Sequence, residues 1–152
     1  MIIETVRDHR SAIVELISES GQFDEEGIHH VLETLDAYLE GSSNGMWFTA
    51  LDDAPIGAAY CAPEPVTSGT WNLLFLWLKG GYAGRGFGRR LVAEVESSIK
   101  DAGARLLIVE TSQLPEFETA RAFYASAGFT LEAEIKDFFD AGDNKLVYTK
   151  RV

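Results

Sequence analysis

The stretch from Trp71 to Leu78 is almost wholly apolar and rich in aromatic side chains. Such a run is typical of a β-strand that is buried on both faces. The segment that follows, Lys79–Gly88, is crowded with glycine and cannot begin as regular structure. Apolar residues then recur every four positions from Phe87 to Ile99, which predicts one buried face of a helix. The pattern therefore predicts a strand, a glycine loop and a helix N-terminus.

The same alternation of apolar and polar positions predicts the elements on either side of this unit. The expected strands are Met1–Val6, Gly45–Leu51, Ile56–Ala62, Leu106–Val109, Phe129–Phe138 and Lys145–Lys150, and the expected helices are Asp8–Ser20, Asp24–Glu40 and Pro115–Ala127. The order is β-α-α-β-β-β-α-β-α-β-β, which belongs to the α/β class. A strand–helix–strand unit makes parallel neighbours through a right-handed crossover. The chain has no repeat and no linker, so we predict one domain over residues 1–152.

Composition narrows the class of protein. A hydrophobic content of 46% is that of a globular chain. No apolar run reaches the roughly 18 residues that a membrane span needs, and we expect no secretory signal before the fold. Cys61 is the only cysteine, so no internal disulfide can form, and we expect a buried, inert thiol in a cytoplasmic protein.

The formal net charge of −11 is the strongest bias in the composition. It argues against a nucleic-acid partner, because phosphates attract basic surfaces. It agrees with a cationic substrate, which the field of the protein would attract, but solubility alone explains an acidic surface equally well. No metal site is expected.

Gly84, Gly86 and Gly88 form a G-x-G-x-G pattern at the start of the predicted helix. The first N–H groups of a helix have no partners in the chain, and glycines let a ligand approach the backbone closely. A pyrophosphate suits these conditions, and Arg85 and Arg89 would add positive charge. A helix entry that needs small residues only for packing fits equally well. A Rossmann pattern would need Gly at position 89, and no G-K-S/T of a P-loop follows.

Two motifs in this order of elements resemble those of the GNAT superfamily of N-acetyltransferases. Ala83–Gly88 (AGRGFG) matches the pyrophosphate signature Q/R-x-x-G-x-G/A at all but the first place. Ala120–Phe129 (ARAFYASAGF) matches the downstream pattern A-x-x-F/L-Y-x-x-x-G-F. The resemblance spans the chain and implies an acyl-CoA N-acyltransferase fold of the GNAT type. That fold has a central mixed, mostly antiparallel seven-stranded sheet flanked by four helices.

The resemblance also implies a site and a bacterial-type enzyme with acetyl-CoA as co-substrate. Acetyl-CoA would lie in a wedge between the fourth and fifth strands, with the Leu76 N–H at the developing oxyanion and Tyr124 protonating the leaving thiolate. Glu110 is the nearest carboxylate that could act as base, and a water chain is an equal alternative. The implied cofactor-binding residues are Leu76, Trp77, Leu78, Gly84, Arg85, Gly86, Phe87, Gly88 and Arg89.

The sequence departs from the family pattern at two informative positions. Ala83 stands where the signature has Gln or Arg, and Asn72 stands where some members place a general-base Glu. These departures keep a second function open, a non-catalytic acyl-CoA-binding or sensory domain on the same fold. A module whose loop holds another phosphate ligand is a further alternative.

The leading hypothesis is an N-acetyltransferase that acts on a primary amine by direct attack, either a small cationic amine or a peptide amine. Acceptor specificity is expected from the first two helices and their loop, the 62–69 loop and the last hairpin. Acidic residues in these segments favour a cation; they are Glu33, Asp36, Glu64, Asp140 and Asp143. A homodimer through the last strands is also open, because edge strands need cover.

Overall fold

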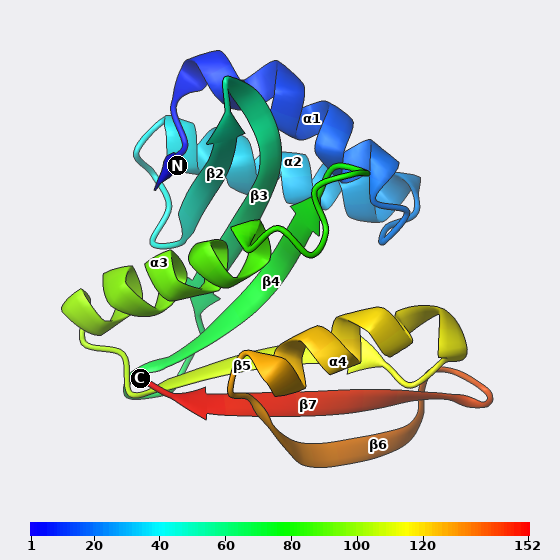
Figure 1. The fold of residues 1–152 in the computed structure, drawn as a ribbon. Coiled ribbons are helices and arrows are strands. Elements are labelled where there is room, and N and C mark those ends of the chain that lie inside the picture. The colour runs from blue at the N-terminus through cyan, green and yellow to red at the C-terminus, as the bar shows by residue number, and fades with distance from the viewer.

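The computed structural model describes residues 1–152 as one seven-stranded sheet with helices on both faces (Figure 1). Along the sheet the strands follow the order β1-β2-β3-β4-β5-β7-β6. The strands are β1 (Ile2–Glu4), β2 (Met46–Asp52), β3 (Ala54–Pro63), β4 (Thr70–Leu78), β5 (Leu106–Ser112), β6 (Thr130–Asp140) and β7 (Asp143–Arg151). The helices are α1 (Arg10–Glu19), α2 (Glu25–Leu39), α3 (Phe87–Asp101) and α4 (Glu118–Ser126), with short 3₁₀ turns at Arg7–His9 and Pro115–Phe117.

Only one pair of strands in the sheet is parallel. Strands β1 to β4 pair antiparallel in sequence order, and β5, β7 and β6 also pair antiparallel. The parallel pair is β4 with β5, which α3 connects. The sheet is therefore mixed and mostly antiparallel, and the predicted order of elements is confirmed.

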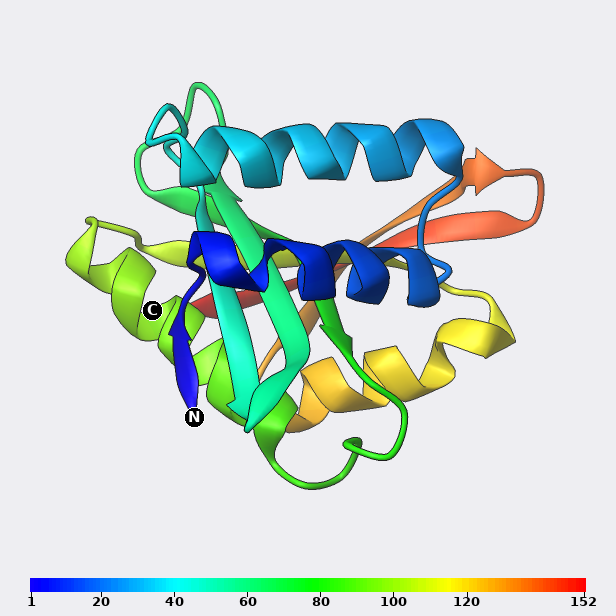
Figure 2. The ribbon, with the colours of Figure 1, turned by 90° about the horizontal axis from the view of Figure 1, so that it is seen from above.

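The two faces of the sheet bury separate hydrophobic clusters. Helices α1 and α2 cover one face of β1 to β4, as Figure 2 shows from above, and α3 and α4 cover the other face. The first cluster joins Ile13, Leu16 and Leu35 of α1 and α2 to Trp47 and Phe75 of the sheet. The second and larger cluster packs the apolar stripe of α3 and Tyr124 of α4 onto β2, β3, β4, β5 and β7.

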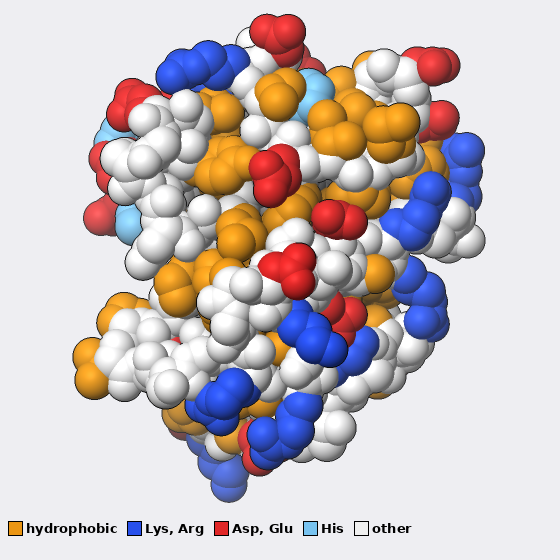
Figure 3. Space-filling view, turned by 90° about the vertical axis from the view of Figure 1, so that its left-hand side faces the viewer, with side chains coloured by type: hydrophobic (Ala, Val, Ile, Leu, Met, Phe, Trp, Pro, Cys, Tyr) orange, Lys and Arg blue, Asp and Glu red, His pale blue; other side chains and the backbone are white.

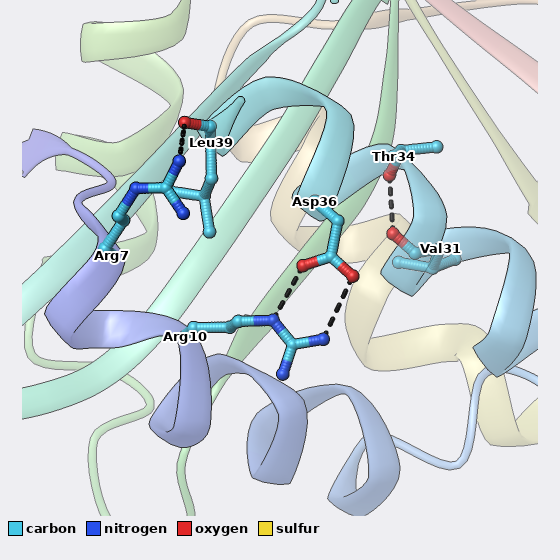
Figure 4. A network of polar contacts seen from close by, with 6 residues as sticks. All are labelled: Arg7, Arg10, Val31, Thr34, Asp36 and Leu39. Atoms are coloured by element: carbon cyan, nitrogen blue, oxygen red, sulfur yellow. Dashed lines mark hydrogen bonds and ion pairs between the residues drawn. The ribbon is translucent and has the colours of Figure 1, made fainter. Parts of the chain in front are cut away.

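Local side-chain bonds fix the ends and the pairing of α1 and α2. Asp24 caps α2, because its carboxylate accepts a hydrogen bond from the Gly27 N–H at 2.8 Å. Arg10 of α1 donates two hydrogen bonds to Asp36 of α2, at 2.6 and 3.0 Å (Figure 4). The hydrogen bonds from Arg10 hold the pKa of Asp36 below its usual value. This pair orients the two helices and, being half-exposed, contributes little to stability.

Two strands differ from the pattern that the sequence predicts. Leu74, in the middle of the apolar β4 run, is 47% exposed, whereas burial on both faces is expected. All eleven residues of β6 are exposed, although their alternation predicts one buried face. The reason is tertiary: β6 is the last strand of the sheet, and no helix covers its outer side.

Charged side chains are distributed over the surface. On the face in Figure 3, acidic side chains run down the middle, and Lys and Arg side chains gather below them. None of the helices has the length and apolar character needed to cross a lipid bilayer.

Candidate active site

Strands β4 and β5 separate after three residues. Their pairing covers Thr70–Asn72 of β4 and Leu106–Ile108 of β5 and then stops. A bulge in β4 coincides with the separation, because Leu73 pairs with Cys61 of β3 and Phe75 with Tyr60, which leaves Leu74 without a partner. A bulge bends its strand. The remainder of β4 therefore has an unpaired edge that faces away from β3.

The alternation of the ladder decides which β4 amides lie on that edge. The Lys79 N–H donates to the Ile56 carbonyl of β3 at 2.8 Å. Successive residues in a strand point their peptide groups to opposite sides, so the amides of Leu76 and Leu78 point to the unpaired edge. Trp77 points its amide to β3, and its side chain packs in the α1–α2 cluster. The Trp77 backbone therefore does not face the unpaired edge, and its role in cofactor binding stays a prediction.

A cavity of about 440 Å³ fills the opening between the two strands. Its walls come from β4, β5, α4, the loop between α1 and α2, and the β6–β7 hairpin. The lining is mainly apolar. Its apolar members include Phe23, Leu74, Leu76, Phe117, Tyr124 and Phe139. Its polar members include Gln22, Asn72, Glu110, Ser112 and Asp143. Of the predicted catalytic residues, Leu76, Glu110 and Tyr124 all line this cavity.

Tyr124 lies on α4 with its ring in an aromatic cluster. The rings of Phe123, Phe129 and Tyr148 lie 5.5 to 6.3 Å from it, measured between centroids. Burial is the sole cause that raises the pKa of Tyr124 to about 12. The phenol therefore stays protonated at every pH at which the protein would work, and it can donate a hydrogen bond into the cavity.

The carboxylates of the cavity already have partners within the chain. Glu110 pairs with Lys145 Nζ at 2.9 Å. Asp143 accepts a short hydrogen bond from the Ser112 hydroxyl. Lys145 also lies over the ring of Phe138, 4.1 Å from the centroid. Glu110 is thus already paired with a cation, whereas Asp143 is hydrogen-bonded only to a neutral hydroxyl.

The other acidic residues expected at the acceptor site do not line the cavity. Asp36 pairs with Arg10, and Glu33 pairs with His29 at 3.0 Å on the outside of α2. Glu64 accepts a hydrogen bond from Asn72 Nδ2 at 2.8 Å. Asn72 is 4% exposed. The hydrogen bond from Asn72 to Glu64 explains why position 72 carries an amide, where the resemblance implies a carboxylate in some members.

The glycine loop leaves a set of backbone amides free at the start of α3. The first hydrogen bond of the helix runs from the Arg90 N–H to the Gly86 carbonyl at 3.1 Å. The four amides from Gly86 to Arg89 therefore have no acceptor within the helix. Gly84 and Gly86 have φ angles of 75° and 87°, a region that side-chain-bearing residues rarely adopt. The loop can present these amides to an anion.

The arginines of the loop differ in their contacts. Arg85 Nη2 lies 3.8 Å from Asp52 Oδ2, and its guanidinium lies over the Tyr82 ring at 4.8 Å. Arg89 is exposed and has no ion pair. Gly88, in the first turn of α3, packs against α4, where an added Cβ would lie 3.1 Å from the Phe123 ring. That close packing ties the loop to the helix that carries Tyr124.

Three cavity residues have no motif that would have revealed them. Gln22, in the loop between α1 and α2, donates to the Leu76 carbonyl on the unpaired edge at 3.2 Å. Phe23 and Phe139 supply apolar walls from segments more than 100 residues apart in sequence. Only the preceding glycine stop of α1 indicated that a loop begins near Gln22.

Cys61 is buried in β3, and burial raises the pKa of its thiol to about 12. We expect the native protein to react with a thiol reagent at least a hundredfold more slowly at pH 8 than the unfolded chain, because the thiolate is scarce and covered. Absorbance after addition of a disulfide reagent, with and without denaturant, measures both rates. Fast labelling of the native chain would contradict this burial.

The protein has no group of three or more His, Cys, Asp and Glu side chains arranged to hold a metal ion. The groups that line the cavity include backbone amides, a protonated phenol and carboxylates. This set can hold a carbonyl oxygen and donate to a leaving group.

The sequence and the fold were compared with known proteins. Residues 11–129 match the acetyltransferase (GNAT) family. A protein from Desulfovibrio desulfuricans, described as an acetyltransferase of the GNAT family, is 30% identical with a TM-score of 0.91. The match covers 99% of this chain and 98% of that one. No curated protein matches the sequence significantly.

More distant solved structures share the fold. An aminoglycoside 6'-N-acetyltransferase complexed with coenzyme A has 15% identity and a TM-score of 0.82, over 99% of this chain and 96% of that chain. A ribosomal-protein-alanine N-acetyltransferase from Brucella melitensis has 18% identity and a TM-score of 0.76, over 100% and 99% of the two chains. At these identities the similarity is one of fold.

Proposed function

Because the chain belongs to the acetyltransferase (GNAT) family and is an acyl-CoA-dependent N-acetyltransferase, we propose that it transfers the acetyl group of acetyl-CoA directly to a primary amine. The observation that carries this proposal is the separation of β4 from β5, which exposes the Leu76 amide beside Tyr124 in one cavity. The expected place of action is the cytoplasm, where the single thiol stays reduced.

Backbone amides and the Tyr124 hydroxyl would each have a separate role in this reaction. The free amides from Gly86 to Arg89 bind the pyrophosphate, with Arg89 adding charge. The Leu78 and Leu76 backbone binds the pantetheine arm, which carries amides of its own. The Leu76 N–H donates to the thioester oxygen as negative charge develops there, an interaction worth about 3 kcal/mol in comparable sites. Tyr124 donates to the thiolate that leaves.

The acceptor amine must lose a proton before or during attack. Glu110 is the carboxylate of the cavity on β5, and one of its oxygens is held by Lys145. We propose that a water bonded to the other oxygen of Glu110 relays the proton from the amine to that carboxylate, which becomes protonated. The apolar lining and the pairing of Glu110 with Lys145 favour an uncharged amine body over the polycationic one that the net charge alone would favour.

Calorimetry and a thiol-release assay test the function separately. Coenzyme A should bind with one site per chain, while ATP and NAD should not bind. Free thiol should then appear with acetyl-CoA only when a suitable primary amine is present. Binding without thiol release across a broad amine panel would favour the non-catalytic acyl-CoA-binding alternative, and absence of binding would contradict both.

We also propose a homodimer through β6. This edge strand is exposed along its whole length, and Leu131, Ile135, Phe138 and Phe139 are 47% to 51% exposed. Antiparallel pairing of two copies of β6 about Ile135 would set Glu134 opposite the partner's Lys136 on each side of the two-fold axis. Opposite charges in cross-strand pairs stabilise a sheet, and pairing removes the open edge.

Replacing Ile135 with Lys is expected to yield a monomer, because two like charges would then face each other on the two-fold axis. Sedimentation equilibrium should give about twice the 16.7 kDa chain mass for the unmodified protein and the chain mass for the variant. Val66, which is fully exposed in the loop before β4, provides the control as Val66→Lys. If the unmodified protein sediments as a monomer, the proposed dimer is wrong.

A further inference from the structure

A second cavity, of about 150 Å³, adjoins the active-site cavity between α2 and the sheet. It is lined by Phe23, His30, Val31, Thr34, Tyr60 and Leu74. Phe23 and Leu74 line both cavities. These two side chains therefore form the partition between the space beside Leu76 and Tyr124 and the space under α2.

The β4 bulge explains why the partition exists. Without the extra residue, the side chains after Leu73 would alternate strictly between the faces of the sheet. Leu74 has no partner on β3, and its side chain is 47% exposed while its neighbours Leu73 and Phe75 are buried. The β4 bulge, which coincides with the opening of the active-site cavity, thus also directs the Leu74 side chain between the two cavities.

The lining of the second cavity is apolar and aromatic. Phe23 packs against Phe75 at 6.0 Å, and Tyr60 stacks on Trp47 at 4.9 Å between ring centroids. The Thr34 hydroxyl donates to the Val31 carbonyl at 2.6 Å and so is already satisfied (Figure 4). His30 is exposed and stands where the cavity opens to solvent. No carboxylate or ammonium group lines the space.

A cavity of this size and character suits a ring. An apolar cavity of about 150 Å³ in another protein stays dry and binds benzene. An amine that reaches the thioester through the first cavity would extend its far end past Leu74 and Phe23. The second cavity would bury that end only if it is apolar, because a charged group would find no partner there.

On the basis of the proposed acetyl transfer, we propose that the cavity under α2 is a second acceptor subsite, which binds the aromatic or branched apolar end of a primary-amine substrate. The preferred acceptor is then an amine joined by a short aliphatic chain to a ring, such as 2-phenylethylamine. Ethylamine and linear diamines are poor acceptors by comparison, because the first lacks a group to bury and the second would bury a charge.

Binding is tested first by NMR, independently of turnover. In the protein with coenzyme A bound, added 2-phenylethylamine should shift the methyl signals of Val31 and Leu74, and ethylamine should not. Shifts at these methyls support the subsite even if no acetyl transfer follows, in which case only the proposed reaction fails. No shift at saturating amine, or shifts confined to other methyls, overturns the subsite whether or not the protein acetylates amines.

Selectivity is tested next, as the ratio of kcat/KM for 2-phenylethylamine to that for ethylamine. Val31→Phe fills the cavity and should lower this ratio about tenfold, in line with the discrimination that apolar pockets achieve. The same substitution at Val14, which lines neither cavity, should leave the ratio unchanged.

Leu74→Ala gives a second variant that does not crowd the core, because Leu74 is half-exposed. Removing the partition should raise the relative kcat/KM for a naphthyl-bearing amine at least several-fold over that for 2-phenylethylamine. An unchanged ratio in both Val31→Phe and Leu74→Ala overturns the proposal.

Discussion

Replacing Tyr124 with Phe is expected to lower kcat about a hundredfold while the dissociation constant of acetyl-CoA stays within twofold. Removal of a positioned proton donor has effects of about this size. The ring packs against Phe123, Phe129 and Tyr148 and would remain in place. The variant therefore removes one hydroxyl from the cavity and little else. Steady-state kinetics with calorimetry separates the two quantities.

The pH profile provides a second readout for the same variant. Burial raises the pKa of Tyr124 to about 12, above the usual value near 10. A raised pKa keeps the phenol protonated as pH rises, so its ability to donate persists below about pH 10 and is lost only as pH approaches 12. Activity of the unmodified protein should rise with pH as the amine loses its proton, with no fall from Tyr124 ionisation below pH 10.

Tyr148→Phe is the matched control. Tyr148 is as buried as Tyr124 and belongs to the same aromatic cluster, but it does not line the cavity. Its hydroxyl should be dispensable for kcat. Equal kcat for Tyr124→Phe and the unmodified protein would exclude Tyr124 from the reaction, and an equal loss in both variants would indicate a structural effect.

Replacing Gly86 with Val is expected to raise the dissociation constant of coenzyme A at least tenfold. Gly86 precedes α3 with a φ angle of 87°, where a β-branched residue is strained. No atom lies within 4 Å of an added Cβ, so the effect comes from the backbone and not from crowding. To relieve the strain the loop must turn, and the amides from Gly86 to Arg89 then no longer converge on the pyrophosphate. Calorimetry measures the loss.

Gly41→Val controls for strain alone. Gly41 follows α2, has a φ angle of 77° and also has open space around an added Cβ. Both variants should lose similar melting temperature, whereas only Gly86→Val should lose affinity. If the two variants bind coenzyme A equally well, the glycine loop is not the pyrophosphate site.

The local pattern was sufficient for the elements and their order. Each helix has a continuous apolar stripe and a stop, such as Gly41 after α2, so its identity depends on neighbours three or four residues away. The strand–loop–helix unit around Gly86 was visible for the same reason, because its positive φ and its free amides are local properties. Tyr124 was identified from the resemblance of Ala120–Phe129 to the downstream motif of the family.

The residues on the acceptor side of the site could not be predicted from local sequence patterns. Gln22, Phe23, Leu74 and Phe139 meet only because three separate segments converge on the opening between β4 and β5. Asp143 was expected among the acids of the acceptor site and Glu110 as a candidate base, and facing strands bring Ser112 to the first and Lys145 to the second. Such pairings depend on strand register, which no local pattern records.

The sequence by itself therefore determined the α/β order and the helix entry at Gly86, since each depends on contacts along one element, and its resemblance to the family supplied the candidate tyrosine. The tertiary structure alone decided that β4 bulges at Leu74, that the wedge opens there, and that a second apolar cavity adjoins it. The physical reason is that a cavity is bounded by residues far apart in the chain, and its shape is set by how whole elements pack.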